Sequence, residues 1–432
     1  MTKKDYILLF TLFVFIFQPP FLPYSLIYLL GPIVLWALSR NRSYEKRCII
    51  QKSKIKKISV FFFQLTVYLF FINLLELIIS EDKFLLETRL RCINQLLILS
   101  LFQFSFIVYL LLKFEERQFG LENVMDYLVK AGLVQGICAV VAFLVPQVRQ
   151  LFIMFGDQEL FSNEFFMERR GFGFSMTLID TFGYGMGLIA GYILLFNWSK
   201  EKNKKLLLAF LLISFAIAVN ARTGILVILI AIAVKYLYCN SISTFFKRIL
   251  PVFLVIYGVI TYAPALLAAG ARSENATISW ICFSFSDIFE LLQDSGKLDS
   301  AAELDFFSTF IGLPTNPFEL LFGAGHYVYD TQDTLGFRTD IGYLNMFWEF
   351  GILGSAILLL FMLSLLLKPF YMTRDIAIKK ISLFNTITYF ALLMKAILIG
   401  YNPGVFINYL VTFSLYFYIW KEKQQSLSRQ HH

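Results

Sequence analysis

The sequence predicts an all-α, polytopic integral membrane protein with about twelve transmembrane helices. Apolar stretches of the length that a bilayer requires recur along the whole chain of 432 residues. Only 16% of the residues are charged, whereas 58% are hydrophobic and 49 are phenylalanine. A soluble domain of this size carries more charge and fewer aromatic residues. The stretches leave no room for a soluble domain to fold on its own, so residues 1–432 are predicted to form a single transmembrane domain.

The predicted spans follow one another from the N-terminus, each close to the ~20 mostly apolar residues that cross the hydrocarbon core. They cover residues 6–20, 21–38, 58–79, 93–112, 131–154, 176–196, 206–219, 223–238, 249–268, 341–367, 381–400 and 403–420. The first follows Lys3 and Lys4, as the apolar part of a signal peptide would. It lacks a small-residue cleavage site, because Phe-Gln-Pro-Pro stands at 17–20. The two prolines predict that the first two spans form a tight helical hairpin.

The distribution of Lys and Arg predicts that both termini are cytoplasmic. In this orientation the inner connections, such as 39–57 and 197–205, hold 26 of the 38 Lys and Arg residues, and the outer connections hold ten. An excess of basic residues marks the cytoplasmic side of a membrane protein. Topology therefore explains most of the net charge of +8, and no nucleic-acid partner is expected.

The basic residues on the predicted outer face are mostly arginines, eight of the ten. The guanidinium group is planar, binds phosphate oxygens through two parallel N–H bonds and tolerates partial desolvation better than an ammonium group. An outer face of this kind suits an anionic diphosphate at the membrane surface. The alternative is that these arginines form ion pairs with outer acids such as Glu159, Glu164 and Glu168.

Two outer loops are long enough to be functional, at 269–340 and 155–175. The first carries apolar residues at helical spacing with acidic residues between them, which predicts amphipathic helices on the membrane surface or over a cavity. Its apolar positions are Ile281, Phe285, Ile288 and Leu292, followed by Leu304, Phe307 and Ile311. The second loop carries Arg169 and Arg170.

Two glycine-containing segments predict local geometry. Residues 220–224, Asn-Ala-Arg-Thr-Gly, are expected to form a tight outer turn that places Arg222 at the head of a helix. Arg222 would there contact either a substrate phosphate or the lipid headgroups. Gly183, Gly187 and Gly191 recur every four residues, a spacing that lets two membrane helices approach closely, and this pattern predicts helix packing.

The run 338–354 contains the strongest candidates for chemistry. Asp340 is placed at the outer mouth of a span, where a carboxylate could accept the proton of a sugar hydroxyl or simply cap a helix. Glu349 follows nine residues later, about 13 Å deeper at 1.5 Å per residue. Ionisable groups inside a bilayer are costly and usually functional, although an ion pair with Lys395 is the alternative for Glu349. Tyr343 and Asn345 are candidates for acceptor binding.

Three short stretches carry a family resemblance. They are Ala-Arg-Thr-Gly at 221–224, Phe-Gly-Ala-Gly at 322–325, and the Asp-x-Gly-Tyr-Leu…Glu-Phe-Gly-Ile-Leu-Gly run at 340–354. In their order and topological positions they resemble the O-antigen polymerase and ligase superfamily of membrane glycosyltransferases. The resemblance implies a GT-C-like architecture with a long periplasmic loop, in the inner (plasma) membrane of a bacterium.

The resemblance also implies an activity in lipopolysaccharide or other surface polysaccharide biosynthesis. An O-antigen polymerase transfers the growing glycan from undecaprenyl diphosphate onto the non-reducing end of a lipid-linked repeat unit at the periplasmic face. Both donor and acceptor are then undecaprenyl-diphosphate-linked oligosaccharides, and a chain-length regulator protein is a further candidate partner. No cofactor and no metal are expected, and the sequence shows no cluster with metal-ligand spacing.

Residue roles follow from the same resemblance. Asp340 matches the position of the proposed catalytic base. The family's outer-loop arginines are thought to hold the diphosphate, and their counterparts here are Arg170, Arg222 and Arg338, with Arg169 and Arg272 as weaker matches.

Other activities remain open from the sequence. Ligases, which move polymer to the lipid A core, typically carry His-Asn where this chain has Asp340-Ile341; His326 lies fourteen residues earlier and is a further catalytic candidate. A lipid-linked oligosaccharide flippase or other transporter could also have twelve spans, but such proteins commonly show matching halves, and the loop at 269–340 has no counterpart in the first half. A scaffold protein would need neither intramembrane charges nor outer arginines.

Overall fold

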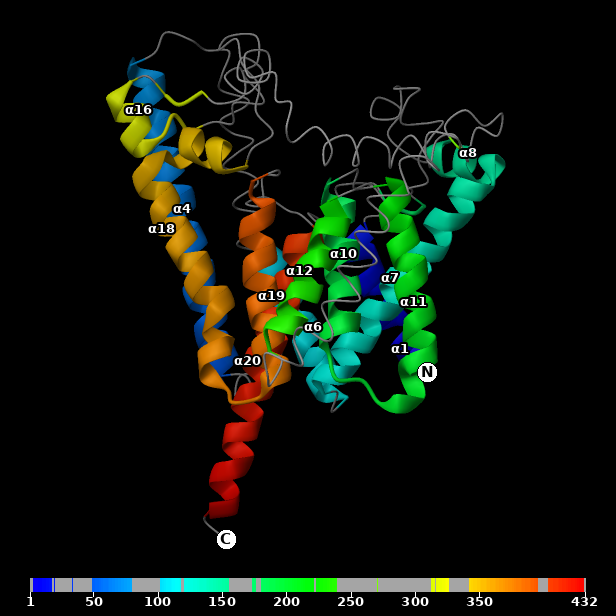
Figure 1. Ribbon diagram of the computed structural model, residues 1–432. Coiled ribbons are helices and arrows are strands. Elements are labelled where there is room, and N and C mark those ends of the chain that lie inside the picture. The colour runs from blue at the N-terminus through cyan, green and yellow to red at the C-terminus, as the bar shows by residue number, and fades with distance from the viewer. Residues whose placement is uncertain are drawn as a thin grey trace. The chain divides into compact units, whose positions relative to one another are not determined.

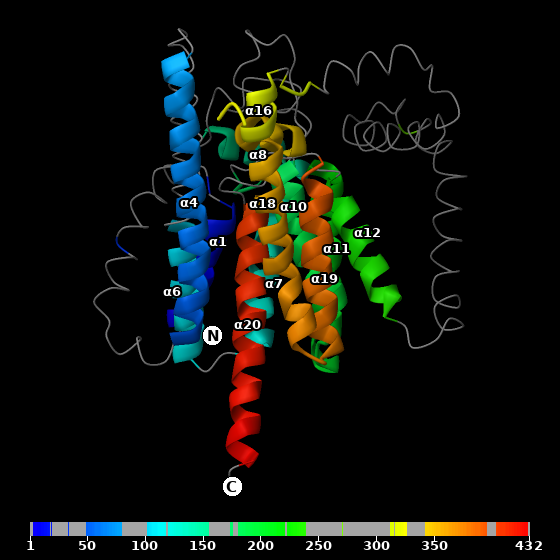
Figure 2. The same ribbon diagram turned by 90° about the vertical axis from the view of Figure 1, so that its left-hand side faces the viewer.

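The computed structural model is built from helices, and the part of the chain that it describes contains no β-strand (Figures 1 and 2). The described residues are 3–17, 19, 33, 49–79, 102–117, 120–154, 173–175, 180–220, 223–238, 270, 312–314, 316–325, 342–394 and 403–430. The predicted all-α class is therefore confirmed for these residues.

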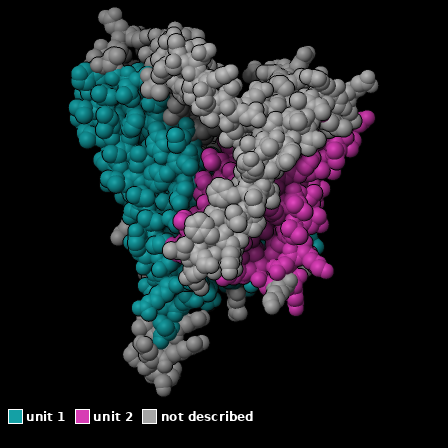
Figure 3. All heavy atoms as spheres, in the orientation of Figure 1, with its two compact units in different colours: residues 1–16, 22–128, 307–432 teal, residues 17–21, 129–306 magenta. Residues whose placement is uncertain are grey.

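The chain forms two compact units, coloured in Figure 3. Unit 1 comprises residues 1–16, 22–128 and 307–432, and unit 2 comprises residues 17–21 and 129–306. Unit 1 holds α1 (Lys3–Phe17, except its last residue), α4 (Ile49–Ile79), α6 (Phe104–Glu116), α16 (Pro317–Phe322), α18 (Gly342–Met372), α19 (Ile376–Leu392) and α20 (Pro403–Gln430). Unit 2 holds α8 (Pro146–Met154), α10 (Asp180–Leu195), η3 (Lys200–Lys202), α11 (Asn203–Asn220) and α12 (Thr223–Leu237). The helix α7 (Leu121–Leu144) begins in unit 1 and continues in unit 2. Whether the units form one membrane domain stays a prediction.

Several helices have the length and the surface of membrane spans. Among the described residues, α7, α11 and α18 are long and apolar enough to cross a bilayer, and four shorter apolar helices accompany them. On α18 the exposed side chains at successive turns are Leu353, Ile357 and Leu360, which are 48%, 57% and 66% exposed. A continuous exposed apolar stripe indicates contact with lipid. A helical membrane protein is thus supported, whereas the number of twelve spans and their orientation stay predictions.

The helix boundaries correct several of the sequence-based spans: α19 covers Ile376–Leu392 where 381–400 was predicted, and α4 begins at Ile49 where 58 was predicted. The clearest correction concerns the fifth span. A single helix was predicted over 131–154, but α7 begins at Leu121 and ends at Leu144, and α8 starts afresh at Pro146. Proline has no N–H to donate and restricts the residue before it, so it suits the first position of a helix and interrupts a continuing one. The predicted spans 21–38 and 249–268 lie outside the described residues, apart from Ile33, as do the amphipathic helices predicted at 281–311.

Close packing of α10 on α12 organises unit 2. A Cβ added at Gly187 would lie 2.8 Å from the Cβ of Val227 and 3.0 Å from the carbonyl oxygen of Gly224. A Cβ added at Gly224 would in turn lie 2.7 Å from the carbonyl oxygen of Gly183. The predicted helix-packing role of this glycine pattern is therefore confirmed for Gly183 and Gly187, and its partner is the glycine of the Ala-Arg-Thr-Gly stretch.

Pro369 interrupts the backbone hydrogen bonds of α18, and other helices of unit 1 compensate. A proline inside a helix leaves the carbonyl four residues earlier without its usual donor. That carbonyl belongs to Leu365, and the hydroxyl of Tyr416 on α20 donates to it at 2.9 Å. The hydroxyl of Ser382 on α19 donates to the neighbouring Leu366 carbonyl at 2.7 Å. These bonds connect α18, α19 and α20 in a region where no water would satisfy the carbonyls.

Polar side chains also join α19 to α20 directly. Asn385, Asn408 and Thr412 are completely buried. The Asn385 amide donates to the Thr412 hydroxyl at 3.4 Å, and the Asn408 amide donates to the Asn385 carbonyl at 3.3 Å. Interhelical hydrogen bonds of this kind are worth about 0.6 kcal/mol each in membrane proteins, so they fix the register of the two helices more than they stabilise them.

We expect Gly187→Ala to destabilise the protein, because the new methyl group would overlap Val227 and separate α10 from α12. Overpacking of this kind costs about 1–3 kcal/mol. Gly136→Ala is the matched control, since its Cβ would lie 3.6 Å from Ile213, an ordinary contact. Both changes gain the same helix propensity, so the difference between their unfolding temperatures in detergent measures the close packing alone. Equal temperatures would contradict the α10–α12 contact.

Candidate functional site

The long loop predicted at 269–340 contains a short helix, α16, whose ends are defined by its sequence. The Asn316 side chain accepts a hydrogen bond from the Phe318 N–H at 3.0 Å and donates to Glu319 at 3.3 Å. Pro317 occupies the first helical position, where its missing N–H costs nothing. Asn, Pro and Glu at these positions form a helix start related to the capping box. Sequence reasoning missed α16, although this signal was present.

A tight turn follows α16 and contains the Phe-Gly-Ala-Gly stretch. Gly323 and Gly325 have φ angles of +90° and +76°, which favour glycine. The Gly323 N–H donates to the Glu319 carbonyl at 2.7 Å, and the next N–H, of Ala324, donates to the Trp348 carbonyl of α18 at 2.6 Å. The second bond joins this turn to the first half of α18, at Trp348.

The helix α18 is broken at Gly351, which has φ +66° and ψ −179°. A break inside a membrane helix frees backbone carbonyls that must find other donors. The Ala324 N–H supplies one of these donors. The Ser355 hydroxyl supplies another, to the Met346 carbonyl at 2.9 Å. On α4, the Tyr68 hydroxyl donates to the Phe322 carbonyl at 2.5 Å and lies 3.4 Å from the Phe350 carbonyl.

The turn and the break fit together so closely that no side chain would fit between them. A Cβ added at Gly323 would lie 2.5 Å from the Glu349 carbonyl oxygen and 2.6 Å from the Gly351 nitrogen. A Cβ added at Gly351 would collide with the Leu321 carbonyl group. Glycine is therefore required at both positions for two reasons: the φ angle is positive, and another segment of backbone occupies the Cβ position. The stretches 322–325 and 349–351, separated in the sequence, form one packed element.

Glu349 lies at this element and is completely buried. Moving a carboxylate out of water is costly, and the cost falls when hydrogen bonds, an ion pair or protonation compensate it. Asn345 precedes Glu349 by four residues, on the same face of the helix, and is also completely buried. The Glu349 position thus combines a titratable group, a buried amide and an interrupted backbone. Lys395, the predicted partner of Glu349, lies outside the described residues.

Tyr343 has a structural contact in the first turn of α18. Its hydroxyl donates to the Phe390 carbonyl at 2.8 Å, and its N–H donates to the Leu393 carbonyl at 3.1 Å. Both carbonyls belong to the end of α19, where helices leave carbonyls without intrahelical partners. Tyr343 therefore holds the start of α18 against the end of α19. The acceptor-binding role suggested for Tyr343 and Asn345 stays a prediction.

The remaining candidates lie outside the described residues. They are Asp340, His326, Arg169, Arg170, Arg222, Arg272 and Arg338. Described helices nevertheless begin close to two of them. Helix α18 begins two residues after Asp340. Helix α12 begins directly after Arg222, and only two residues separate it from the end of α11 at Asn220. The expected short connection between these two spans is confirmed.

The structure adds residues that sequence reasoning did not select. Tyr68 and Asn73 lie on α4, and a Cβ added at Gly325 would lie 2.7 Å from the Asn73 Oδ1 atom. The indole N–H of Trp348 donates to the Gly312 carbonyl at 2.8 Å. A tyrosine or tryptophan in an apolar run carries no sign of which distant carbonyl it will reach, so only the helix α16 had a readable signal.

The described residues contain no group of three His, Cys, Asp or Glu side chains that could hold a metal ion. The expectation of metal-independent chemistry stays a prediction. Comparison of the chain with profiles of known protein families, with curated proteins and with solved structures gives no match.

We expect Tyr68→Phe to loosen the packed element, because it removes the donor to the Phe322 carbonyl. Leaving a buried carbonyl without a donor costs about 1–3 kcal/mol. Tyr371→Phe is the matched control, since Tyr371 is 75% exposed. Unfolding in detergent, followed by tryptophan fluorescence, should show a lower midpoint for Tyr68→Phe only. An unchanged midpoint would mean that the Tyr68 hydroxyl does not hold the turn.

Proposed function

We propose that this chain is a polysaccharide polymerase, a membrane glycosyltransferase of the O-antigen polymerase type. It transfers the growing glycan from undecaprenyl diphosphate onto the non-reducing end of a lipid-linked repeat unit, at the periplasmic face. One observation carries the proposal: two of the stretches that resemble this superfamily, 322–325 and 349–351, pack against each other around the buried Glu349.

This packing supports the proposal because two stretches that carry the resemblance, although separate in the sequence, lie together in space. Irregular backbone at membrane depth is tolerated where it is buried in protein or lines a polar cavity. Both glycines at the contact have positive φ angles, and both Cβ positions are occupied by backbone. A protein that needed only to cross the membrane would have no use for a helix break beside a buried carboxylate. The element is therefore best understood as support for a site at the outer end of α18.

The proposed reaction uses groups that precede α18 and α12. The oxygen of the acceptor hydroxyl attacks the anomeric carbon of the donor, and its proton passes to the Asp340 carboxylate, which acts as general base. The bond between the anomeric carbon and the diphosphate oxygen breaks, and the lipid diphosphate leaves with the electron pair. Displacement without a covalent glycosyl intermediate inverts the anomeric configuration.

Fixed positive charge would stabilise the leaving diphosphate. Arg222 and Arg338, together with Arg170, are the proposed contacts, and Arg169 and Arg272 are secondary candidates. Charge stabilisation by preorganised groups in a partly dehydrated site is often the largest single contribution to catalysis. No metal ion is needed for this step, because guanidinium groups can neutralise both phosphates.

A gel of surface polysaccharide from cells that lack this gene tests the activity. We expect the deletion to leave single repeat units on the lipid A core, because chain growth is lost while ligation survives. The wild-type gene should restore long chains. Asp340→Asn should not, since loss of a general base typically costs about 10²–10⁴-fold in rate. Glu201→Gln, the same kind of change at an exposed position of η3, should restore them fully.

Other patterns on the gel, together with the location of the glycans on the lipid carrier, would contradict the proposal. Loss of all surface sugar, with long polymer retained on the lipid carrier, would indicate a ligase. Lipid-linked single units trapped on the cytoplasmic side would indicate a flippase. Normal chain lengths with Asp340→Asn, at equal protein in the membrane, would remove that residue from the mechanism.

We propose that Glu349 is a positioning residue that acts through an ion pair with Lys395. Glu349→Gln should then shorten the chains, because it leaves the lysine unpaired in the bilayer, where an isolated charge is costly. The double variant Glu349→Gln with Lys395→Met should recover chain length, as both charges are gone. A double variant as defective as Glu349→Gln alone would indicate instead that the carboxylate contacts the substrate.

A further inference from the structure

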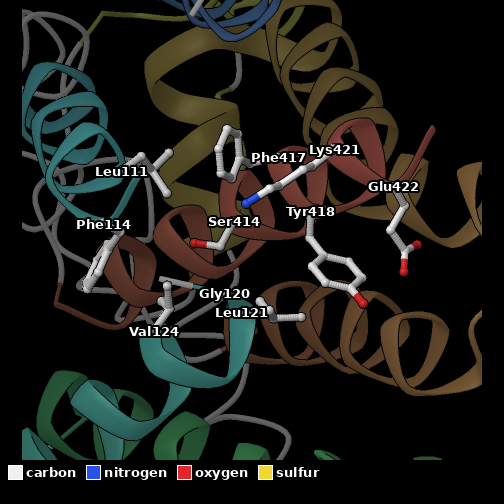
Figure 4. A pocket seen from close by; sticks show the side chains of 10 residues that line it. All are labelled: Leu111, Phe114, Gly120, Leu121, Val124, Ser414, Phe417, Tyr418, Lys421 and Glu422. Carbon is white, nitrogen blue, oxygen red and sulfur yellow. The ribbon is translucent and has the colours of Figure 1, made fainter. Parts of the chain in front are cut away.

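A cavity of about 250 Å³ lies in unit 1, where α20 passes the end of α6 and the start of α7 (Figure 4). No resemblance or proposed role involves it. At about 30 Å³ per water molecule, it has room for roughly eight. This volume suits the polar headgroup of one lipid, or a small metabolite, and is too small for acyl chains. It is independent of the polymerase proposal.

One face of α20 forms a wall of the cavity. Ser414, Phe417, Tyr418, Lys421 and Glu422 all line it. Their spacing of three, one, three and one places them in a single stripe along a helix. The stripe changes from apolar and hydroxyl groups to two opposite charges within eight residues, at the point where the apolar run of α20 ends.

The opposite wall is apolar and buried. Leu111, Phe114 and Val124 line the cavity and are each less than 5% exposed. Helix α6 ends at Glu116, with the basic residue Lys113 in its last turn. Gly120 directly precedes α7. In the predicted topology, residues 113–130 and 421–432 are inner connections, so this cavity would lie where the helices leave the hydrocarbon region.

Lys421 and Glu422, the two charged residues at the cavity, do not pair with each other. Within the described part of the chain, Lys421 and Glu422 form no ion pair together or with a third residue, although the Tyr418 hydroxyl donates a hydrogen bond to the Glu422 carboxylate. In Figure 4 the Lys421 amine lies beside Ser414 and Phe417, whereas the Glu422 carboxylate lies on the far side of Tyr418. The Ser414 hydroxyl already donates to the Leu410 carbonyl at 2.7 Å. Both Lys421 and Glu422 are exposed, so a headgroup that enters the cavity can reach both charges.

We propose that this cavity binds the zwitterionic headgroup of a lipid that carries phosphoethanolamine. The Lys421 ammonium contacts the phosphate, and the Glu422 carboxylate contacts the primary ammonium group. The ring of Tyr418, between the two charges, offers an aromatic face to the ammonium group. The acyl chains lie outside the cavity along the apolar surfaces of the helices. One cation and one anion match a net-neutral headgroup better than they match an anionic one.

The position of the cavity favours a lipid over a soluble phosphate compound. Among the helices that line it, α7 is long and apolar enough to cross a bilayer, where lipid is the most concentrated ligand. The sequence places this end of α20 on the cytoplasmic side, so the lipid belongs to the inner leaflet. Binding at the junction of α6, α7 and α20 would favour the arrangement of these elements in unit 1.

Short-chain lipids added to the purified full-length protein in detergent test the proposal. The thermal unfolding midpoint is followed with dihexanoyl phosphatidylethanolamine, phosphatidylcholine or phosphatidylglycerol, and with inorganic phosphate. A ligand that binds the folded state raises the midpoint in proportion to its saturation of the site. We expect phosphatidylethanolamine to raise the midpoint most. Lys421→Gln and Glu422→Gln should each weaken its binding about tenfold, which corresponds to about 1.4 kcal/mol.

Two matched controls make the test specific. Lys423→Gln removes the same charge from the same helix at an exposed position outside the cavity, and should leave binding unchanged. A Cβ added at Gly120 meets open space. Gly120→Ala should therefore preserve binding.

Several results would overturn the proposal. Phosphatidylglycerol binding as well as phosphatidylethanolamine would show that the site recognises negative charge alone. An equal effect of inorganic phosphate would identify a site for free anions. An equal loss with Lys423→Gln and Lys421→Gln would indicate nonspecific attraction to the end of α20. Full binding of phosphatidylethanolamine by both Lys421→Gln and Glu422→Gln would place the lipid elsewhere.

Discussion

The need to satisfy every backbone carbonyl inside a bilayer governs the arrangement of unit 1. Helix α18 is interrupted twice, at Gly351 and at Pro369, and each interruption frees carbonyls that no water would reach. The donors come from Tyr68 on α4, from the turn after α16, and from Tyr416 on α20. Three elements are therefore required beside α18, at defined heights, for reasons that have nothing to do with apolar burial. Burial alone is non-directional and would allow these helices to slide.

The two interruptions have different consequences. At Pro369, hydroxyl groups of other helices donate to the nearby carbonyls, and the helix stays continuous. At Gly351 the backbone leaves helical geometry, and another segment of backbone enters the space that a side chain would occupy. The second arrangement brings together the polar turn after α16, the backbone carbonyls at the end of the first half of α18, and the buried Glu349. The cost of such a region in a membrane is high, which is why we connect it with function and not with the crossing of the bilayer.

Hydropathy predicted most of the helices but not their interruptions. The apolar runs at 206–219, 223–238 and 403–420 correspond to α11, α12 and α20, because a bilayer selects for length and apolar content. The same criterion overlooked the break before Pro146, although polar residues, Pro-Gln-Val-Arg-Gln at 146–150, follow the apolar run there. It also overlooked α16, whose start depends on the local hydrogen bonds of Asn316 and not on periodicity. Of the candidate site, only the order of the glycine-containing stretches was readable; the hydroxyl of Tyr68 reaches a residue 254 positions away.

Glycine shows why the candidate site could not be read from sequence alone. Gly187 and Gly351 both lie in apolar runs near other small residues, and helix packing explains either pattern equally well. In the structure, Gly187 stays helical and admits the side of α12, whereas Gly351 has a positive φ angle and admits the backbone of another segment. The difference lies in the partner: an apolar helix face offers only side chains and shielded backbone, but the turn after α16 offers an N–H that the broken helix needs. A glycine in a membrane helix becomes part of a site when its neighbour can complete the hydrogen bonds that it interrupts.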